Sequence, residues 1–185
     1  MTMSALLTQA LQLIYYFIPA YLANGSPPIL AKLPFLRKWN APVDYGRTWR
    51  GRRILGSHKT WRGVLGGVLL GGLTFLFQKY ALPGIVVPFV PYAALPWWTG
   101  FLLAFGAIVL GDMGESFLKR RVGHAPGKRW IPWDQIDFTL GALLGTCWLF
   151  WPGWVSALFL LVFNGLLSAA SNFIGGYLRV TDGKL

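Results

Sequence analysis

Three acidic residues lie where a membrane protein could use them for chemistry. Asp112 directly follows the apolar run 101–110, and an ionisable side chain at the end of such a run is costly and marks a functional position. Asp134 and Asp137 stand one helical turn apart, just before another apolar run. Mg²⁺ binds a few carboxylates and leaves its other positions to phosphate and water. The sequence therefore predicts a Mg²⁺ site formed by Asp112, Asp134 and Asp137.

A structural role is an open alternative for two of these acids. Asp134 follows Pro132 and could be the N-cap of the next helix, while Asp137 in the first turn would be stabilised by the helix dipole. Capping and metal binding are compatible, so the sequence leaves both interpretations open.

Polar residues also continue beyond Asp112. In a helix that extends past the apolar run, Glu115, Ser116 and Lys119 lie on the same face as Asp112. A Glu115–Lys119 pair would account for part of this pattern, but it would leave Asp112 without a partner. We therefore expect the face to contribute to a site.

Glycines, hydroxyl groups and cations are concentrated in the segment 44–63. This composition, just before a helix, can bind phosphate through backbone N–H groups and cations, although it lacks the P-loop pattern. Attraction to anionic lipids is the alternative explanation for the charge. We expect Lys59 and Arg62, which lie among glycines and hydroxyls, to contact a ligand.

The composition indicates an integral membrane protein. Of 185 residues, 55% are hydrophobic and 12% are charged, about half the charged share of a soluble domain. A span needs about 20 apolar residues. We predict an all-α, single membrane domain (1–185) with five spans, at 4–23, 63–80, 97–113, 138–150 and 154–177.

The cations predict the orientation of these spans. Sixteen of the seventeen Lys and Arg residues fall in the segments 24–62 and 114–137 and in the C-terminal tail, and only Lys79 falls on the other side. Because short loops rich in Lys and Arg stay in the cytoplasm, both segments are expected there, together with the C-terminus. The N-terminus would lie outside, in a multi-pass protein of the cell membrane.

The two basic segments resemble those of a known family. Ser116-Phe-Leu-Lys-Arg120 followed by Asp134-Gln-Ile-Asp137 is similar to the signature of membrane cytidylyltransferases that make CDP-activated lipids. The Lys-Asp pair and His-Gly-Gly element of CDP-diacylglycerol synthases are absent between 121 and 133. The segments 23–28, 42–46, 56–63 and 111–138 instead resemble the CDP-archaeol synthase branch, so the resemblance covers nearly the whole chain.

The resemblance implies a reaction and roles for the residues. CMP would pass from CTP to an isoprenoid ether glycerophosphate of the membrane, with release of pyrophosphate. Asp112, Asp134 and Asp137 would hold Mg²⁺ and, with Lys119, form the catalytic group. The residues expected to bind CTP or lipid phosphate are Lys59, Arg62, Ser116, Lys119, Arg120 and Lys128. Asp44 and Glu115 would hold basic side chains in place.

Other functions stay open at this point. A diacyl phosphatidate could replace the ether lipid, or a CTP-dependent polyprenol kinase could transfer the γ-phosphate instead. A small ion transporter could use Asp112, although the spans lack the polar residues that a path would need. A basic scaffold would leave the clustered acids unexplained. CTP, a lipid phosphate and the bilayer are the expected partners; nucleic acid is not, and an oligomer through exposed glycine faces is allowed.

Overall fold

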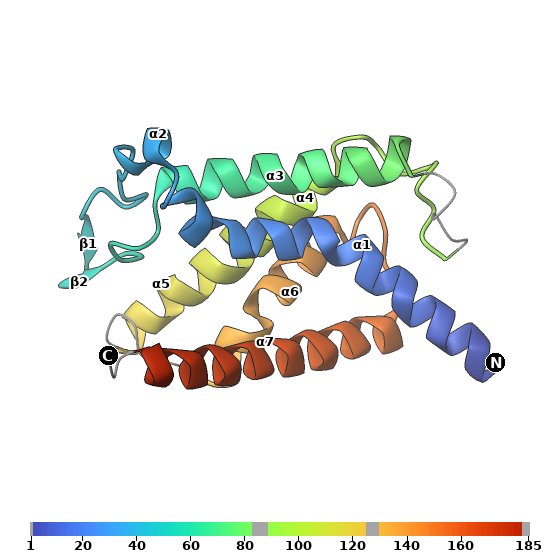
Figure 1. The fold of residues 1–185 in the computed structure, drawn as a ribbon. Coiled ribbons are helices and arrows are strands. Elements are labelled where there is room, and N and C mark those ends of the chain that lie inside the picture. Colours follow the sequence, from blue (N-terminus) through green and yellow to red (C-terminus); the bar gives the residue numbers. More distant parts are fainter. Residues whose placement is uncertain (1, 83–88, 125–129, 183–185) are drawn as a thin grey trace.

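The computed structural model describes residues 2–82, 89–124 and 130–182, which are mostly helical (Figure 1). Four of the helices in this part of the chain are long and apolar enough to cross a membrane. They are α1 (Met3–Leu30), α3 (Trp61–Tyr80), a continuous helix Thr99–Arg121, and α7 (Trp154–Asp182), whose searched part is Trp154–Ser171. The prediction of a helical membrane protein is thus confirmed in this coarser form.

The helix Thr99–Arg121 has an irregular middle. It begins as α4 (Thr99–Phe105), widens into the π-helix η1 (Gly106–Met113) and ends as α5 (Gly114–Arg121). The sequence predicted a span only to residue 113, with a possible helical continuation, and the structure has that continuation. A π-helical turn inside an α-helix often marks a functional position. Here its last turn carries Asp112.

The first and the fourth predicted spans also have different bounds in the structure. The first, predicted at 4–23, continues as α1 through Leu30, because Pro27 and Leu30 pack against glycines at the start of α3. The fourth, predicted at 138–150, is α6 (Trp133–Thr146), a helix of 14 residues. In the turn that follows α6, the N–H groups of Leu149 and Phe150 donate hydrogen bonds to the carbonyl of Thr146.

Glycines allow the helices to approach closely. A Cβ atom at Gly67 would overlap the carbonyl of Ala23, and one at Gly71 would overlap the carbonyl of Pro19, so α3 packs directly on the backbone of α1. A Gly-x-x-x-Gly spacing, as between Gly67 and Gly71, is typical of such close packing between membrane helices. Gly67 and Gly71 thus face another helix of the same chain.

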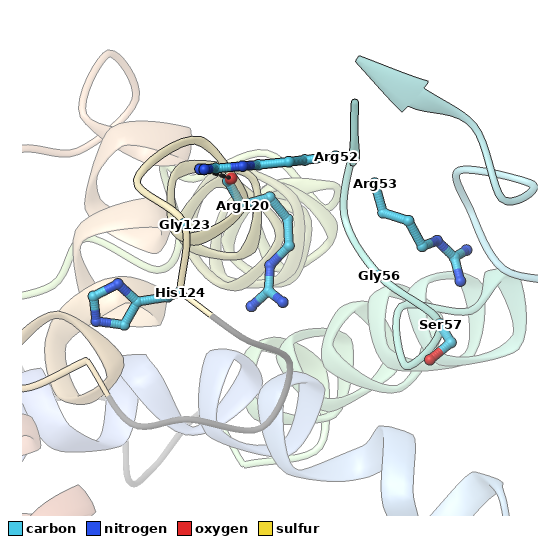
Figure 2. A pocket seen from close by; sticks show the side chains of 7 residues that line it. All are labelled: Arg52, Arg53, Gly56, Ser57, Arg120, Gly123 and His124. Carbon is cyan, nitrogen blue, oxygen red and sulfur yellow. Dashed lines mark hydrogen bonds between the residues drawn. The ribbon is translucent and has the colours of Figure 1, made fainter. Parts of the chain in front are cut away.

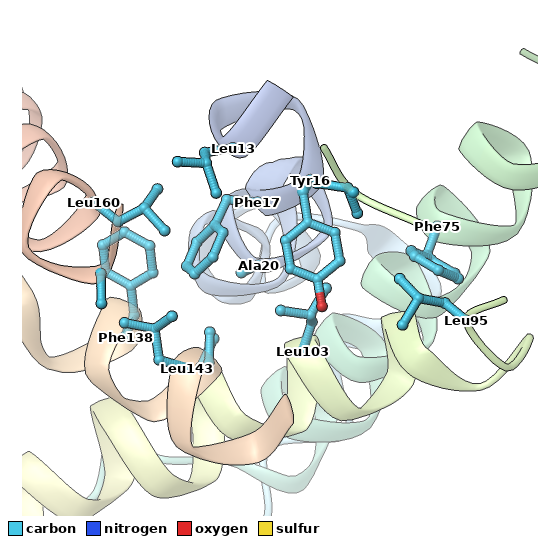
Figure 3. Close-up of a cluster of buried hydrophobic side chains, with 14 of the residues drawn as sticks. Leu13, Tyr16, Phe17, Ala20, Phe75, Leu95, Leu103, Phe138, Leu143 and Leu160 are labelled. Atoms are coloured by element: carbon cyan, nitrogen blue, oxygen red, sulfur yellow. The ribbon is translucent and has the colours of Figure 1, made fainter. Parts of the chain in front are cut away.

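The core lies among α1, α4, α6 and α7. Tyr16, Phe17, Leu103 and Leu160 are almost fully buried there (Figure 3). Along the outside, large apolar side chains are exposed at helical spacing, as Leu65, Leu69 and Leu73 are on α3. Such a surface suits contact with lipid.

Lys79, the single cation predicted on the far side, is used structurally. Its ammonium group donates hydrogen bonds to the carbonyls of Tyr92, Ala93 and Leu95. It therefore anchors the described part of the charge-free connection predicted at 83–96, whose residues 83–88 lie outside the description.

The polar segments gather at one end of the helices. Figure 1 shows α2 (Pro34–Arg37) and the hairpin of β1 (Thr48–Trp49) and β2 (Arg52–Arg53) at the end where α5 and the last turns of α7 lie. The start of α1 lies at the opposite end. The two basic segments predicted at 24–62 and 114–137 thus meet at one end of the molecule.

Candidate active site

Backbone contact between η1 and α6 positions the first acid. A Cβ atom at Gly111 would overlap the backbone of Asp137 and Phe138, and one at Gly141 would overlap Gly106 and Gly111. The glycines therefore let the two helices touch. As a result, Asp112 on η1 is held next to Asp137 on α6.

The carboxylates of Asp112 and Asp137, called the carboxylate pair below, lie near enough for the charge of one to act on the other. Burial, and then the charge of Asp112, raise the pKa of Asp137 to about 7. Lys59, from the loop before α3, donates a hydrogen bond to Asp112 over 2.5 Å. Among the residues that the structure describes, Lys59 is the ammonium group that is ion-paired with the carboxylate pair, through Asp112. A bound divalent cation would supply the remaining countercharge.

A second ion-pair group involves the other predicted ligand. The ammonium of Lys119 lies 2.7 Å from a carboxylate oxygen of Glu115 and 2.7 Å from one of Asp134. The other oxygen of Asp134 accepts a hydrogen bond of 2.8 Å from the N–H of Trp130. Asp134 is therefore occupied by Lys119 and by the turn before α6.

These contacts alter two expectations for Asp134. No group of three His, Cys, Asp or Glu residues in the described part of the chain could hold a metal ion, so the structure does not bring Asp134 together with Asp112 and Asp137 as a ready cluster. Asp134 is also not the N-cap of α6, because that position belongs to Pro132 and the side chain of Asp134 accepts from a residue upstream.

Asp44 organises the loop before α3. Its carboxylate accepts hydrogen bonds from the guanidinium of Arg53 and from the N–H groups of Gly46, Leu55 and Gly56. Burial alone would raise the pKa of Asp44, but these bonds outweigh it and hold the pKa well below its usual range. Asp44 is ion-paired with Arg53, and Glu115 is ion-paired with Lys119.

A cation-lined pocket of about 340 Å³ lies between this loop and the end of α5. Figure 2 shows Arg120 and His124 on one side of it, with Arg53 and Ser57 on the other. Such a lining fits a polyanion, because guanidinium groups bind phosphate oxygens in a bidentate manner. Arg120, predicted to bind phosphate, lies in this pocket beside Arg52 and Arg53.

Sequence reasoning missed most of this lining. Arg52, Arg53 and Ser57 belong to the segment 44–63, where nothing in their spacing distinguishes them, and His124 has no neighbours at metal-ligand spacing. Their signal was weak, because only the folding of the hairpin against α5 brings the two loops together.

The hairpin is fastened to α5 by two arginines. Arg121 donates hydrogen bonds to the carbonyls of Trp49, Arg52 and Arg53, and Arg52 donates to the carbonyls of Arg120 and Arg121. Trp49 also stacks on Phe117 of α5. The reciprocal bonds fix the place of Arg53 relative to Arg120.

Three other predicted ligand residues have different outcomes. Arg62 is buried and donates to the carbonyls of Leu36 and Arg37, so the structure gives it a role in fastening α2 rather than a contact in the pocket. Ser116 is buried on α5. Lys128 lies outside the described residues.

These features define a class of protein: a multi-pass, mostly helical membrane protein with a carboxylate pair and a cation-lined pocket at one end. The fold is similar to a solved structure described as "Structural insight into an intramembrane enzyme for archaeal membrane lipids biosynthesis", with a TM-score of 0.69 and 30% identity, covering 86% of this chain and 92% of that one.

Sequence comparisons identify the family. The family model described as "CarS-like: CDP-archaeol synthase" matches residues 3–184. The chain is 43% identical to the CDP-archaeol synthase of Pyrococcus furiosus over 134 residues, 72% of either chain. It is 42% identical to that of Methanospirillum hungatei over 166 residues, 85% of this chain and 93% of the relative. The chain belongs to the CDP-archaeol synthase family, and it is an enzyme, a nucleotidyltransferase of membrane lipid biosynthesis.

Proposed function

We propose that this enzyme transfers CMP from CTP to 2,3-bis-O-geranylgeranyl-sn-glycerol 1-phosphate, which gives a CDP-archaeol-type lipid and pyrophosphate. Family membership supports the activity. The observation that carries the site is the meeting of both basic segments at one place: Lys59 of the first reaches Asp112, and Arg53 and Arg120 share one pocket.

The triphosphate of CTP binds in the cation-lined pocket. Arg53 and Arg120 offer guanidinium groups, and Ser57 and His124 offer further polar groups. Asp44 keeps Arg53 in place. Lys59, which belongs to the same loop before α3, is ion-paired with Asp112. Several cations are needed because the triphosphate and the departing pyrophosphate carry multiple negative charges.

The carboxylate pair fits Mg²⁺. Mg²⁺ is usually bound by one or two carboxylates together with waters and substrate phosphates, and Asp112 and Asp137 provide such a pair. When bound, the ion neutralises the charge that develops on the phosphates. We assign Asp134 a positioning role instead, because it holds Lys119 in place.

The reaction needs positioning more than base catalysis. A phosphate monoester has a second pKa of about 6, so the lipid phosphate is largely a dianion at neutral pH. One of its oxygens forms a bond to the α-phosphorus of CTP, and the bond from that phosphorus to the bridging oxygen of the β-phosphate breaks. Lys59, Lys119 and Arg120 neutralise the negative charge on the phosphates of CTP and on the departing pyrophosphate. No proton transfer from the attacking oxygen is required.

We also propose the topology that the cations predict. In one membrane domain, 1–185, the residues of α6 from Phe138 onward, with the turn after it, form a fifth crossing. The N-terminus is outside, and the site faces the cytoplasm, where CTP is present. The start of α1 and the last turns of α7 at opposite ends of the helices support an odd number of crossings (Figure 1).

Label transfer tests the function directly. The purified protein receives α-labelled CTP, Mg²⁺ and either the digeranylgeranyl glycerophosphate or a diacyl phosphatidate. We expect label in the prenyl lipid and none without Mg²⁺. Label only in the diacyl lipid would show that phosphatidate is the substrate. Transfer only from γ-labelled CTP would show that the enzyme is a kinase.

A further inference from the structure

A second cavity, of about 460 Å³, opens between α5 and α6 on the side of the acids. Unlike the cation-lined pocket, its walls are mainly apolar. Its lining includes Leu110, Leu118, Trp133, Leu140 and Leu144. We call this cavity the α5–α6 groove.

The groove touches the acidic site and is open to the side. Asp137 and Glu115 belong to its lining, so its polar part coincides with one member of the carboxylate pair. Leu118, Trp133, Leu140 and Leu144 are each about half exposed, which leaves the groove accessible from outside the helices. An apolar chain could therefore enter sideways from the bilayer, and its phosphate would be accepted beside Asp137 when Mg²⁺ offsets the charge of the carboxylates.

We propose that the α5–α6 groove binds the part of a prenyl chain nearest the glycerophosphate of the lipid substrate. The inference rests on the proposed function, because it assigns a binding place to the lipid of that reaction. An apolar chain in the groove brings its phosphate beside Asp137, while CTP enters through the separate cation-lined pocket. The two substrates thus arrive from different sides.

The size of the groove limits how much chain it holds. The stretch of α6 from Asp137 to Leu144 is about 10 Å long at the helical rise, much shorter than a geranylgeranyl chain. The far end of the chain therefore stays in the bilayer. The enzyme should depend on the structure of the chain near the glycerol and be insensitive to its total length.

Gly114 offers a way to fill the groove without damaging the helix packing. It lies in the lining, and a Cβ atom there would meet only the carbonyl of Val109, at 3.8 Å. We expect Gly114→Leu to raise KM for the prenyl lipid about tenfold or more, with equilibrium binding of CTP unchanged. The matched control is Gly25→Leu, since Gly25 also lies in a helix and has nothing within 4 Å. It should leave both substrates unaffected.

The proposal is overturned if Gly114→Leu and Gly25→Leu have equal KM values for the lipid. If Gly114→Leu loses CTP binding or does not fold, a second variant, Leu144→Trp, takes its place. Leu144 lies further along α6 from the acids, and the KM of this variant for the lipid is compared with that of Gly25→Leu. Unchanged lipid KM in that variant would overturn the proposal.

A binding experiment separates this inference from the proposed function. A prenyl glycerophosphate with a photoreactive group near its glycerol is cross-linked to the wild-type protein without CTP, and the modified peptides are mapped. Cross-links in 110–118 and 133–144 support the groove even if no label transfer occurs. Cross-links confined to α3 or α7 would overturn the groove, even in an active enzyme.

Discussion

Lys59 donates a hydrogen bond over 2.5 Å to Asp112, a residue 53 positions further along the chain. This ion pair joins the loop before α3 to the π-helical turn of the central helix. Because Asp112 also lies next to Asp137, Lys59 limits the repulsion between the two carboxylates. A ligand that approaches the acids meets a cation already in place.

Removal of the Asp112 charge should stop the reaction without unfolding the protein. Asp112→Asn keeps the shape of the side chain but removes a carboxylate from the proposed Mg²⁺ site, so we expect turnover to fall by about 10²-fold or more. Label transfer from α-labelled CTP and the elution profile in detergent measure the two effects. Near-normal activity would contradict the metal assignment. The control Lys38→Gln changes an exposed charge of the segment 24–62 and should be fully active.

Asp44 should stabilise the protein in a pH-dependent way. Its folded pKa lies below the unfolded value of about 3.9, so its contribution is complete above that pH and is lost as the pH falls towards the folded pKa. Asp44→Asn leaves part of the hydrogen-bonded loop unsatisfied and should cost about 1 to 3 kcal/mol at pH 7. Thermal unfolding from pH 7 down to pH 3 measures this, and the difference from wild type should shrink below about pH 4. A difference independent of pH would exclude the ionised carboxylate as its cause.

The helices and the acids could be predicted from sequence because their signals are local. Apolar runs marked α1, α3 and α7, and costly charges marked Asp112 and Asp137. The pocket could not be predicted, because Arg53 and His124 come together only through reciprocal backbone bonds of Arg52 and Arg121. The same limit explains Arg62, whose basic setting resembled a phosphate site although its donors reach α2 carbonyls.

Arg121 should act on CTP binding through the hairpin. Its guanidinium serves three backbone carbonyls, and a lysine ammonium at the same place lacks the planar fork that reaches them together. We expect Arg121→Lys to raise KM for CTP about tenfold with little change in kcat. Steady-state label transfer at varied CTP gives both constants. Arg47→Lys is the control, since Arg47 is an exposed arginine of the same loop. A fall in kcat alone would contradict a positioning role.

Asp134 and Asp137 should respond differently to Mg²⁺, although they lie one helical turn apart. Asp137 pairs with Asp112, whereas Asp134 is held by Lys119 and by the N–H of Trp130. We therefore expect Asp137→Asn to raise the Mg²⁺ concentration needed for half-maximal activity about tenfold or more. Asp134→Asn should lower kcat because Lys119 loses a partner, with an unchanged Mg²⁺ requirement. Titration of Mg²⁺ in both variants distinguishes the roles, and an equal shift in both would restore Asp134 as a ligand.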